Sequence, residues 1–163
     1  MKQLTFELPD PEATHALGVF IGEHLLPGDT IAAIGDLGAG KTALAQGVAR
    51  GLGVPDEHYV NSPTFSILQI HPGRCPFYHM DLYRIADEDE LLGLGLDECF
   101  DGDGVAYVEW PNRVPGLVPT NALIASIEIR GASRSIQLRS RGDGTSSLFE
   151  RLCKDARNFP PRG

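Results

Sequence analysis

The sequence predicts a single-domain α/β fold with a central, mainly parallel sheet, antiparallel hairpin additions and helices on both faces. Three observations support this prediction. Apolar runs of strand length at residues 30–34 and 105–109 are typical of buried parallel strands. A glycine-rich loop follows the first run and leads into a helical stretch. Two strand-like segments flank a turn at residues 71–73, which indicates an antiparallel hairpin beside the parallel core.

The glycine-rich loop, Gly35–Thr42, matches the P-loop pattern G-x-x-x-x-G-K-[ST] at every fixed position. Its glycines let successive backbone N–H groups point at phosphate oxygens without obstruction by side chains. Lys41 can then reach the β- and γ-phosphates, and the Thr42 hydroxyl can ligate Mg²⁺. The strand before the loop and the helix after it supply the context that this motif needs. The sequence therefore predicts a P-loop NTPase fold in which a nucleotide is bound by Asp36, Leu37, Gly38, Ala39, Gly40, Lys41 and Thr42.

Composition and charge argue against several other classes of protein. The chain of 163 residues is long enough for one full core, and its net charge of −8 argues against simple electrostatic binding to nucleic acid. No stretch approaches the roughly 18 apolar residues of a membrane span, and the first residues lack the apolar core of a signal peptide. Three widely spaced cysteines favour reduced thiols. We therefore expect a cytoplasmic protein that does not associate with a membrane.

The N-terminal part of the chain is expected to form a strand and a helix before the loop. Residues 2–8 alternate apolar and polar side chains, as a half-buried strand would. Asp10-Pro11 suits the N-cap and first position of a helix that ends near Pro27-Gly28. Thr14 lies on the first turn of this helix, where an ordinary surface threonine is the simplest interpretation. The helix after the loop is expected to stop at two glycines, Gly51 and Gly53.

A hydroxyl-rich loop, Asn61–Phe65, precedes the predicted hairpin and contains a Ser-Pro turn. Such a loop after a P-loop helix can sense the γ-phosphate and Mg²⁺. Thr64 is its candidate sensor, although serine and threonine also serve routinely in turns. The hairpin strands are expected at Phe65–Ile70 and Phe77–Leu82, and the second strand carries Asp81 near its end.

The second apolar run, Val105–Glu109, also ends on a carboxylate. A nucleotide site needs a carboxylate on or near Mg²⁺ at the carboxyl end of a core strand. Asp81 and Glu109 are rivals for that role, and the residues alone do not choose between them. His79, in the same predicted strand as Asp81, is expected to be packed or hydrogen-bonded rather than a metal ligand.

The remaining sequence predicts a short acidic helix, two strands and a last helix. These elements are expected at Asp87–Leu92, Leu123–Arg130, Ser135–Arg139 and Ser147–Lys154, with a turn at Gly131–Arg134 between the two strands. We expect residues 1–145 to form the P-loop domain. Residues 146–163 would then form a C-terminal helix and a tail that is frayed from Asn158 onward.

Four stretches taken together resemble the TsaE (YjeE) family, and the likeness runs in order from about Leu8 to about Leu138. These stretches are Gly35–Thr42, Ser62-Pro63-Thr64-Phe65, His79-Met80-Asp81-Leu82-Tyr83-Arg84 and Val108-Glu109-Trp110-Pro111. The resemblance implies a small ATPase, slow without its partners, that uses ATP and Mg²⁺. It also implies a role in N6-threonylcarbamoyladenosine formation at position 37 of tRNAs that read codons beginning with A. The implied partners are the TsaD and TsaB proteins, with tRNA reached through their complex.

The resemblance also assigns roles to individual residues. Thr42 and Glu109 would hold Mg²⁺, and Asp81 would be needed for ATP turnover or its coupling. The implied catalytic set is Lys41, Thr64, Asp81 and Glu109. Thr14 and Arg134 match positions near the nucleotide in the family.

Three other functions are alternatives for a P-loop protein of this size. In a nucleotide-gated interaction module, ATP would order a docking surface and hydrolysis would only reset it. A small-molecule kinase usually closes mobile basic residues over the phosphates, but residues 43–113 contain only four Lys or Arg residues and no basic cluster: Arg50, Arg74, Arg84 and Arg113. A GTPase is disfavoured because the sequence has no Asn-Lys-x-Asp guanine signature.

Overall fold

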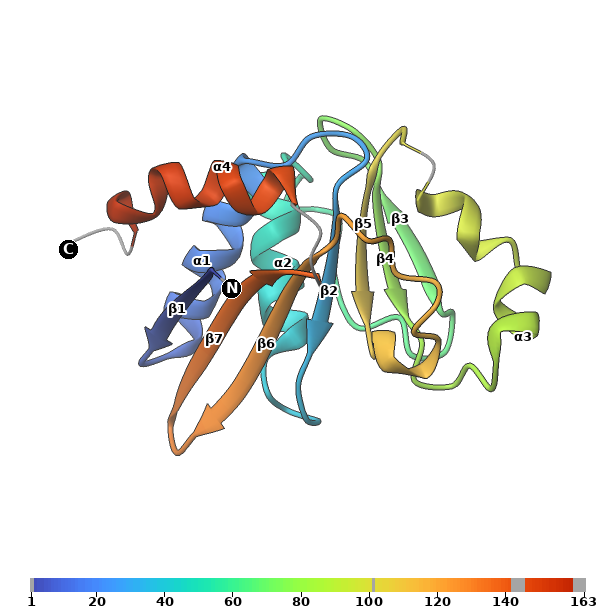
Figure 1. Ribbon diagram of the computed structural model, residues 1–163, viewed down its shortest axis with the longest axis horizontal. Coiled ribbons are helices and arrows are strands. Elements are labelled where there is room, and N and C mark those ends of the chain that lie inside the picture. The colour runs from blue at the N-terminus through green and yellow to red at the C-terminus, as the bar shows by residue number, and fades with distance from the viewer. Residues whose placement is uncertain (1, 101, 142–145, 160–163) are drawn as a thin grey trace.

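The computed structural model describes residues 2–100, 102–141 and 146–159. Their strands form a seven-stranded mixed sheet in the order β1-β7-β6-β2-β5-β4-β3 (Figure 1). The strands are β1 (Gln3–Leu8), β2 (Thr30–Ile34), β3 (Leu68–His71), β4 (Phe77–Asp81), β5 (Val105–Glu109), β6 (Leu123–Arg130) and β7 (Ser133–Ser140). The helices are α1 (Pro11–Glu23), α2 (Lys41–Gly51), α3 (Glu88–Gly93) and α4 (Ser147–Asp155), with short 3₁₀ turns η1 (Leu96–Phe100), η2 (Pro111–Arg113) and η3 (Ala156–Asn158).

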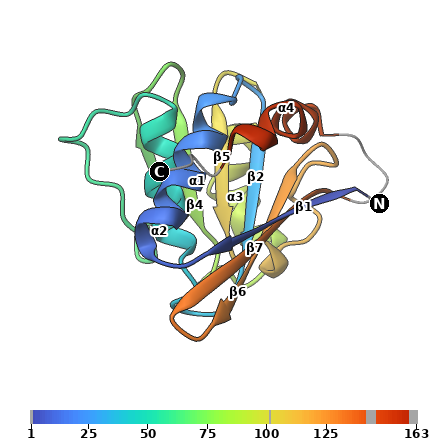
Figure 2. The same ribbon diagram turned by 90° about the vertical axis from the view of Figure 1, so that its left-hand side faces the viewer.

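The centre of the sheet is parallel and its edges are antiparallel, as predicted. Strand β2 lies between β5 and β6 and is parallel to both, and β4 is parallel to β5. The predicted hairpin is present as the antiparallel pair β3–β4. At the other edge β7 pairs antiparallel with β6 and with β1, so the first strand lies alongside one of the last (Figure 2).

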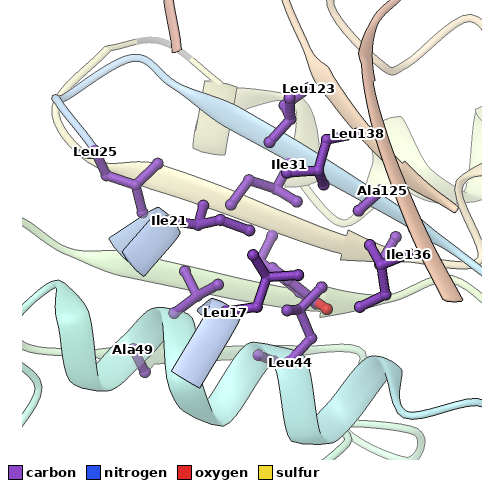
Figure 3. Packing of buried hydrophobic residues seen from close by; sticks show 14 of the residues in the cluster. Leu17, Ile21, Leu25, Ile31, Leu44, Ala49, Leu123, Ala125, Ile136 and Leu138 are labelled. Atoms are coloured by element: carbon purple, nitrogen blue, oxygen red, sulfur yellow. The ribbon is translucent and has the colours of Figure 1, made fainter. Parts of the chain in front are cut away.

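Successive residues of the central strands point to opposite sides of the sheet. Both faces therefore carry apolar side chains, and helices cover both. Val105 and Tyr107 of β5 face the core that α1 and α2 cover, whereas Ala106 and Val108 face the smaller core under α3 and η1. The larger core is built where Leu17 and other apolar residues of α1 and α2 meet strands β2, β6 and β7 (Figure 3).

Three predicted element boundaries were wrong. Strand β7 begins at Ser133 rather than Ser135, because Ser133 already pairs with Arg130 and the turn needs only residues 131–132. Helix α1 begins as expected, with Asp10 as N-cap, but ends at Glu23 because the Asp29 side chain binds the backbone N–H of Leu26 and closes a turn there. Strand β3 begins at Leu68 rather than Phe65. Ile67 has a left-handed backbone (φ 68°), so residues 64–67 form a turn instead of an extended strand.

The C-terminal helix packs on the rest of the protein. Leu148, Phe149 and Leu152 of α4 are buried in the larger core. Phe159, which we expected in a frayed tail, is buried as well, with ring centroids 5.3 Å from those of Phe6 and Phe20. The expected boundary at residue 145 and the tail residues 160–163 lie outside the described residues. Within the described part, no helix has both the length and the apolar character of a membrane span.

Helices α1 and α2 touch backbone to backbone through glycines. A Cβ atom on Gly22 would stand 2.2 Å from the Val48 carbonyl oxygen, and one on Gly47 would stand 2.3 Å from the His15 carbonyl oxygen. Neither oxygen belongs to a side chain that could rotate away. The two helices therefore hold this spacing only while these positions lack a side chain.

We expect Gly22→Ala to lower the free energy of unfolding by about 2 kcal/mol, because the added methyl group forces α1 and α2 apart. Urea unfolding of both proteins would measure the difference. Gly93→Ala is the matched control, since a Cβ on this glycine of α3 would meet no atom of the described residues within 4 Å. Equal losses of stability in the two variants would contradict the interpretation.

Candidate nucleotide-binding site

A pocket of about 400 Å³ opens at the carboxyl ends of the parallel strands β2, β4 and β5. This is the edge of the sheet at which α/β proteins bind ligands. The P-loop, the hydroxyl-rich loop and the ends of β4 and β5 form its walls. The lining residues are Leu37, Gly38, Gly40, Lys41, Thr42, Ala43, Ser62, Thr64, Asp81, Tyr83, Glu109 and Trp110.

The P-loop has the backbone geometry of an anion cradle. Gly38 (φ 80°) and Gly40 (φ 112°) adopt left-handed conformations that favour glycine. Helix α2 begins immediately after Gly40, and this N-cap glycine has no side chain with which to cap the helix. Its first N–H groups and its dipole are therefore directed at the pocket, where they suit a phosphate.

Lys41 is buried and held by the loop itself. Its Nζ donates to the backbone oxygens of Gly35, at 2.5 Å, and Asp36, at 3.0 Å, and lies 4.1 Å from the centre of the Trp110 ring. Burial lowers the pKa of Lys41 below its ordinary value, although the nearby carboxylates, Glu109 first among them, act in the opposite direction. A cation positioned in this way is available to a polyanionic ligand.

The two rival carboxylates have different surroundings. Asp81 Oδ2 accepts hydrogen bonds from Ser62 Oγ at 2.7 Å and Thr64 Oγ1 at 3.0 Å, and its Oδ1 accepts from the Tyr83 N–H at 2.9 Å. Glu109 Oε2 accepts from His79 Nε2 at 2.6 Å. Oε1 of Glu109 accepts no hydrogen bond within the described part of the chain. Asp81 is thus connected to the hydroxyl-rich loop, while Glu109 keeps an oxygen for a ligand.

Thr14 and Arg134 lie behind the P-loop and outside the set of lining residues. Thr14 is buried rather than on the surface, and its Cγ2 is 3.9 Å from the place where a Cβ of Gly40 would stand. Arg134, at the start of β7, donates from Nε to the Ala39 oxygen at 3.0 Å and from Nη2 to the Gly38 oxygen at 3.3 Å. Arg134 therefore supports the loop backbone, and Thr14 lies beside Gly40. The predicted loop residues Asp36 and Ala39 are also outside the lining set, whereas the structure brings Lys41, Thr42, Thr64, Asp81 and Glu109 into one pocket.

Sequence reasoning missed several aromatic contacts of the site. Trp110 has a left-handed backbone (φ 58°) directly after Glu109, which turns its ring back over Lys41. The Tyr83 ring packs on Trp110 with centroids 5.0 Å apart. Tyr107, buried in β5, donates its hydroxyl to the Lys41 backbone oxygen at 2.6 Å. A tryptophan after a strand-ending carboxylate was the available signal, but nothing in the sequence placed it against the lysine.

The P-loop NTPase class of proteins is defined by a strand, a P-loop and a helix, with carboxylates at the ends of neighbouring parallel strands. A family model described as "Threonylcarbamoyl adenosine biosynthesis protein TsaE" matches residues 8–139. The chain belongs to the TsaE family, whose role lies in tRNA threonylcarbamoyladenosine biosynthesis.

Individual relatives agree with the family match. The chain is 41% identical to the tRNA threonylcarbamoyladenosine biosynthesis protein TsaE of Bacillus subtilis, covering 94% of this chain and 96% of the relative. It is 34% identical to the protein of the same name from Haemophilus influenzae, covering 85% of this chain and 90% of the relative. The crystal structure of Bacillus subtilis YdiB superposes with a TM-score of 0.80 at 35% identity, covering 95% of this chain and 97% of that structure.

Proposed function

We propose that this protein is a Mg²⁺-dependent ATPase that works with TsaD and TsaB proteins to form N6-threonylcarbamoyladenosine at position 37 of tRNAs that read codons beginning with A. One observation carries the proposal. Lys41, Thr42, Asp81 and Glu109 line a single pocket at the uncapped N-terminus of α2. The family gives the biological context, and tRNA would be reached through the protein complex.

The P-loop would bind the phosphates of ATP through its backbone N–H groups and the N-terminus of α2. Lys41 would exchange the oxygens of Gly35 and Asp36 for the β- and γ-phosphates, which offer full negative charges instead of carbonyl dipoles. Trp110 would then lose the cation that lies against its ring.

The residues present fit Mg²⁺ in the presence of a nucleotide. The Thr42 hydroxyl and the Glu109 carboxylate are hard oxygen donors, which this ion prefers, and both line the pocket. The described residues contain no group of three or more His, Cys, Asp or Glu side chains able to hold a metal by themselves. Such a small protein donor set suits an ion that takes its other ligands from phosphates and water. The ion would neutralise charge on the phosphates.

Asp81 would link ATP turnover to the hydroxyl-rich loop. It accepts hydrogen bonds from both Ser62 and Thr64, so a γ-phosphate that attracts either hydroxyl also changes what Asp81 contacts. The same carboxylate can orient an attacking water or accept its proton. We assign Asp81 to turnover and coupling, and Glu109 to the metal side.

The nucleotide-gated interaction module is a second candidate, favoured by exposed apolar side chains beside the site. Phe65 is 84% exposed and directly follows Thr64, and Leu37 of the P-loop is 72% exposed. A bound γ-phosphate would order both loops and present these side chains to a partner. ATP would then control docking, and hydrolysis would reset it. Gating requires the partner to distinguish the nucleotide states.

ATP turnover by the purified protein alone, with a TsaD–TsaB complex, and with the complex plus tRNA tests the first candidate. We expect slow turnover alone and faster turnover with partners. Affinity for the complex, measured with ATP, with ADP and without nucleotide, tests the second. Absence of turnover under all conditions would contradict the ATPase proposal, whereas equal affinities in the three states would contradict gating.

A further inference from the structure

His79 is a fully buried polar residue directly behind the nucleotide pocket. It lies in the middle of β4 and is paired with Tyr107 of the parallel strand β5. Tyr107 is two residues before Glu109 in that strand. Its Nε2 is 2.6 Å from Glu109 Oε2. Glu109 lines the pocket and His79 does not, so the hydrogen bond to this carboxylate is the direct link between the histidine and the pocket.

Within the described part of the chain, the His79 side chain makes one hydrogen bond, and its partner is Glu109. Because an ionised carboxylate only accepts hydrogen bonds, Nε2 carries the proton in this pair. Nδ1 is buried and has no hydrogen-bond partner among the described residues. The ring is held by aromatic neighbours, with centroids 6.0 Å from Phe77 and 5.4 Å from Tyr107.

This arrangement is costly for a residue that only fills the core. A buried nitrogen without a partner loses its hydration, and an apolar ring of similar size would pack here without that loss. The contact that compensates is the short hydrogen bond to Glu109. Packing fixes the ring, and the ring in turn fixes one oxygen of the carboxylate.

We propose that His79 is the positioning residue of the metal-side carboxylate. It holds Oε2 of Glu109 so that the carboxylate reaches the divalent cation of a bound nucleotide in one orientation. A carboxylate oriented before binding loses less freedom when the cation arrives, which raises the affinity for the metal. The inference rests on the proposed role of Glu109 and adds a residue that acts through it.

The test is calorimetric titration of ADP, with Mg²⁺ and with EDTA, into the wild type and His79→Phe. The phenylalanine keeps an aromatic ring in the core and removes the donor. We expect His79→Phe to lower the Mg²⁺-dependent gain in ADP affinity about tenfold while metal-free ADP affinity stays within about twofold of the wild type. His79→Gln keeps an N–H donor and should recover most of the gain.

His71→Phe is the matched control. His71 lies in the neighbouring strand β3 and is buried, and its Nε2 has no hydrogen-bond partner among the described residues, but it has no hydrogen bond to Glu109. We expect this variant to keep the full Mg²⁺-dependent gain. Circular dichroism would show that each variant is folded, and His79→Leu replaces His79→Phe if the larger ring prevents folding.

A double-variant cycle with Glu109→Gln asks whether the effect passes through the carboxylate. Glu109→Gln should lower the Mg²⁺-dependent gain, and His79→Phe should add nothing in that background. The inference is overturned if His79→Phe keeps the full gain, if it weakens metal-free binding equally, or if the two effects add. Failure of the wild type to bind ADP would instead overturn the proposed function, and the inference with it.

Discussion

Lys41→Ala should weaken ATP binding about a hundredfold. Charge-assisted hydrogen bonds to phosphates contribute about 3 kcal/mol, and each 1.4 kcal/mol corresponds to roughly a factor of ten in Kd. The variant also releases the oxygens of Gly35 and Asp36 and the Trp110 ring from their contacts with the ammonium group. ATP binding to the wild type has to break these contacts, whereas ATP binding to the variant does not. The net loss of binding free energy is therefore smaller than the full attraction between Lys41 and the phosphates.

Calorimetric titration with ATP and with AMP would measure this effect and its origin. AMP has neither a β- nor a γ-phosphate, so its binding should hardly change in Lys41→Ala. Lys154→Ala is the control, because Lys154 is exposed on α4 and away from the pocket. Unchanged ATP affinity in Lys41→Ala, or an equal loss for AMP, would contradict the assignment of Lys41.

Asp81→Asn should lower ATP turnover about a hundredfold and leave the Kd for ATP within about threefold of the wild type. The substitution preserves shape but introduces an NH₂ group. If that group faces Ser62 and Thr64, two accepted hydrogen bonds are lost, and if it faces the Tyr83 N–H, two donors meet. Either orientation disturbs the link between the strand end and the hydroxyl-rich loop.

Single-turnover hydrolysis in the presence of the partner complex, together with ATP titration, would separate turnover from binding. Asp103→Asn is the matched control, because Asp103 accepts a hydrogen bond from the Tyr78 hydroxyl and does not line the pocket. If Asp81→Asn turned over ATP normally but required more Mg²⁺, the roles given to Asp81 and Glu109 would have to be exchanged.

The parts of the site that the sequence predicts well are those fixed by local pattern. The P-loop glycines, the helix after them and the strand that ends at Glu109 depend on neighbours within a few residues, and the structure has each where it was expected. The hairpin partner of β4 was also predictable, because a turn signal separates two strand-like segments.

The remaining features depend on contacts between distant segments. Arg134 reaches the Ala39 oxygen only because β7 lies across the sheet beside β6, and no local pattern specifies that neighbour. Thr14 is buried because α1 packs closely on α2 through glycines. The pairing of His79 with Glu109 follows from the register of β4 against β5, which is set by packing of the whole sheet.

The pairing of β1 with β7 has a consequence for the chain as it leaves the ribosome. The P-loop is synthesised early, but Leu8 and its strand have no partner until Arg134 and the rest of β7 emerge. At 5–20 residues per second this delay is roughly ten seconds, during which an apolar strand edge stays open to other chains. Arg134 arrives at the P-loop carbonyls in the same step. Nascent chains that stop before β7 should therefore be targets for chaperones, and the nucleotide site gains the support of Arg134 only when β7 has been synthesised.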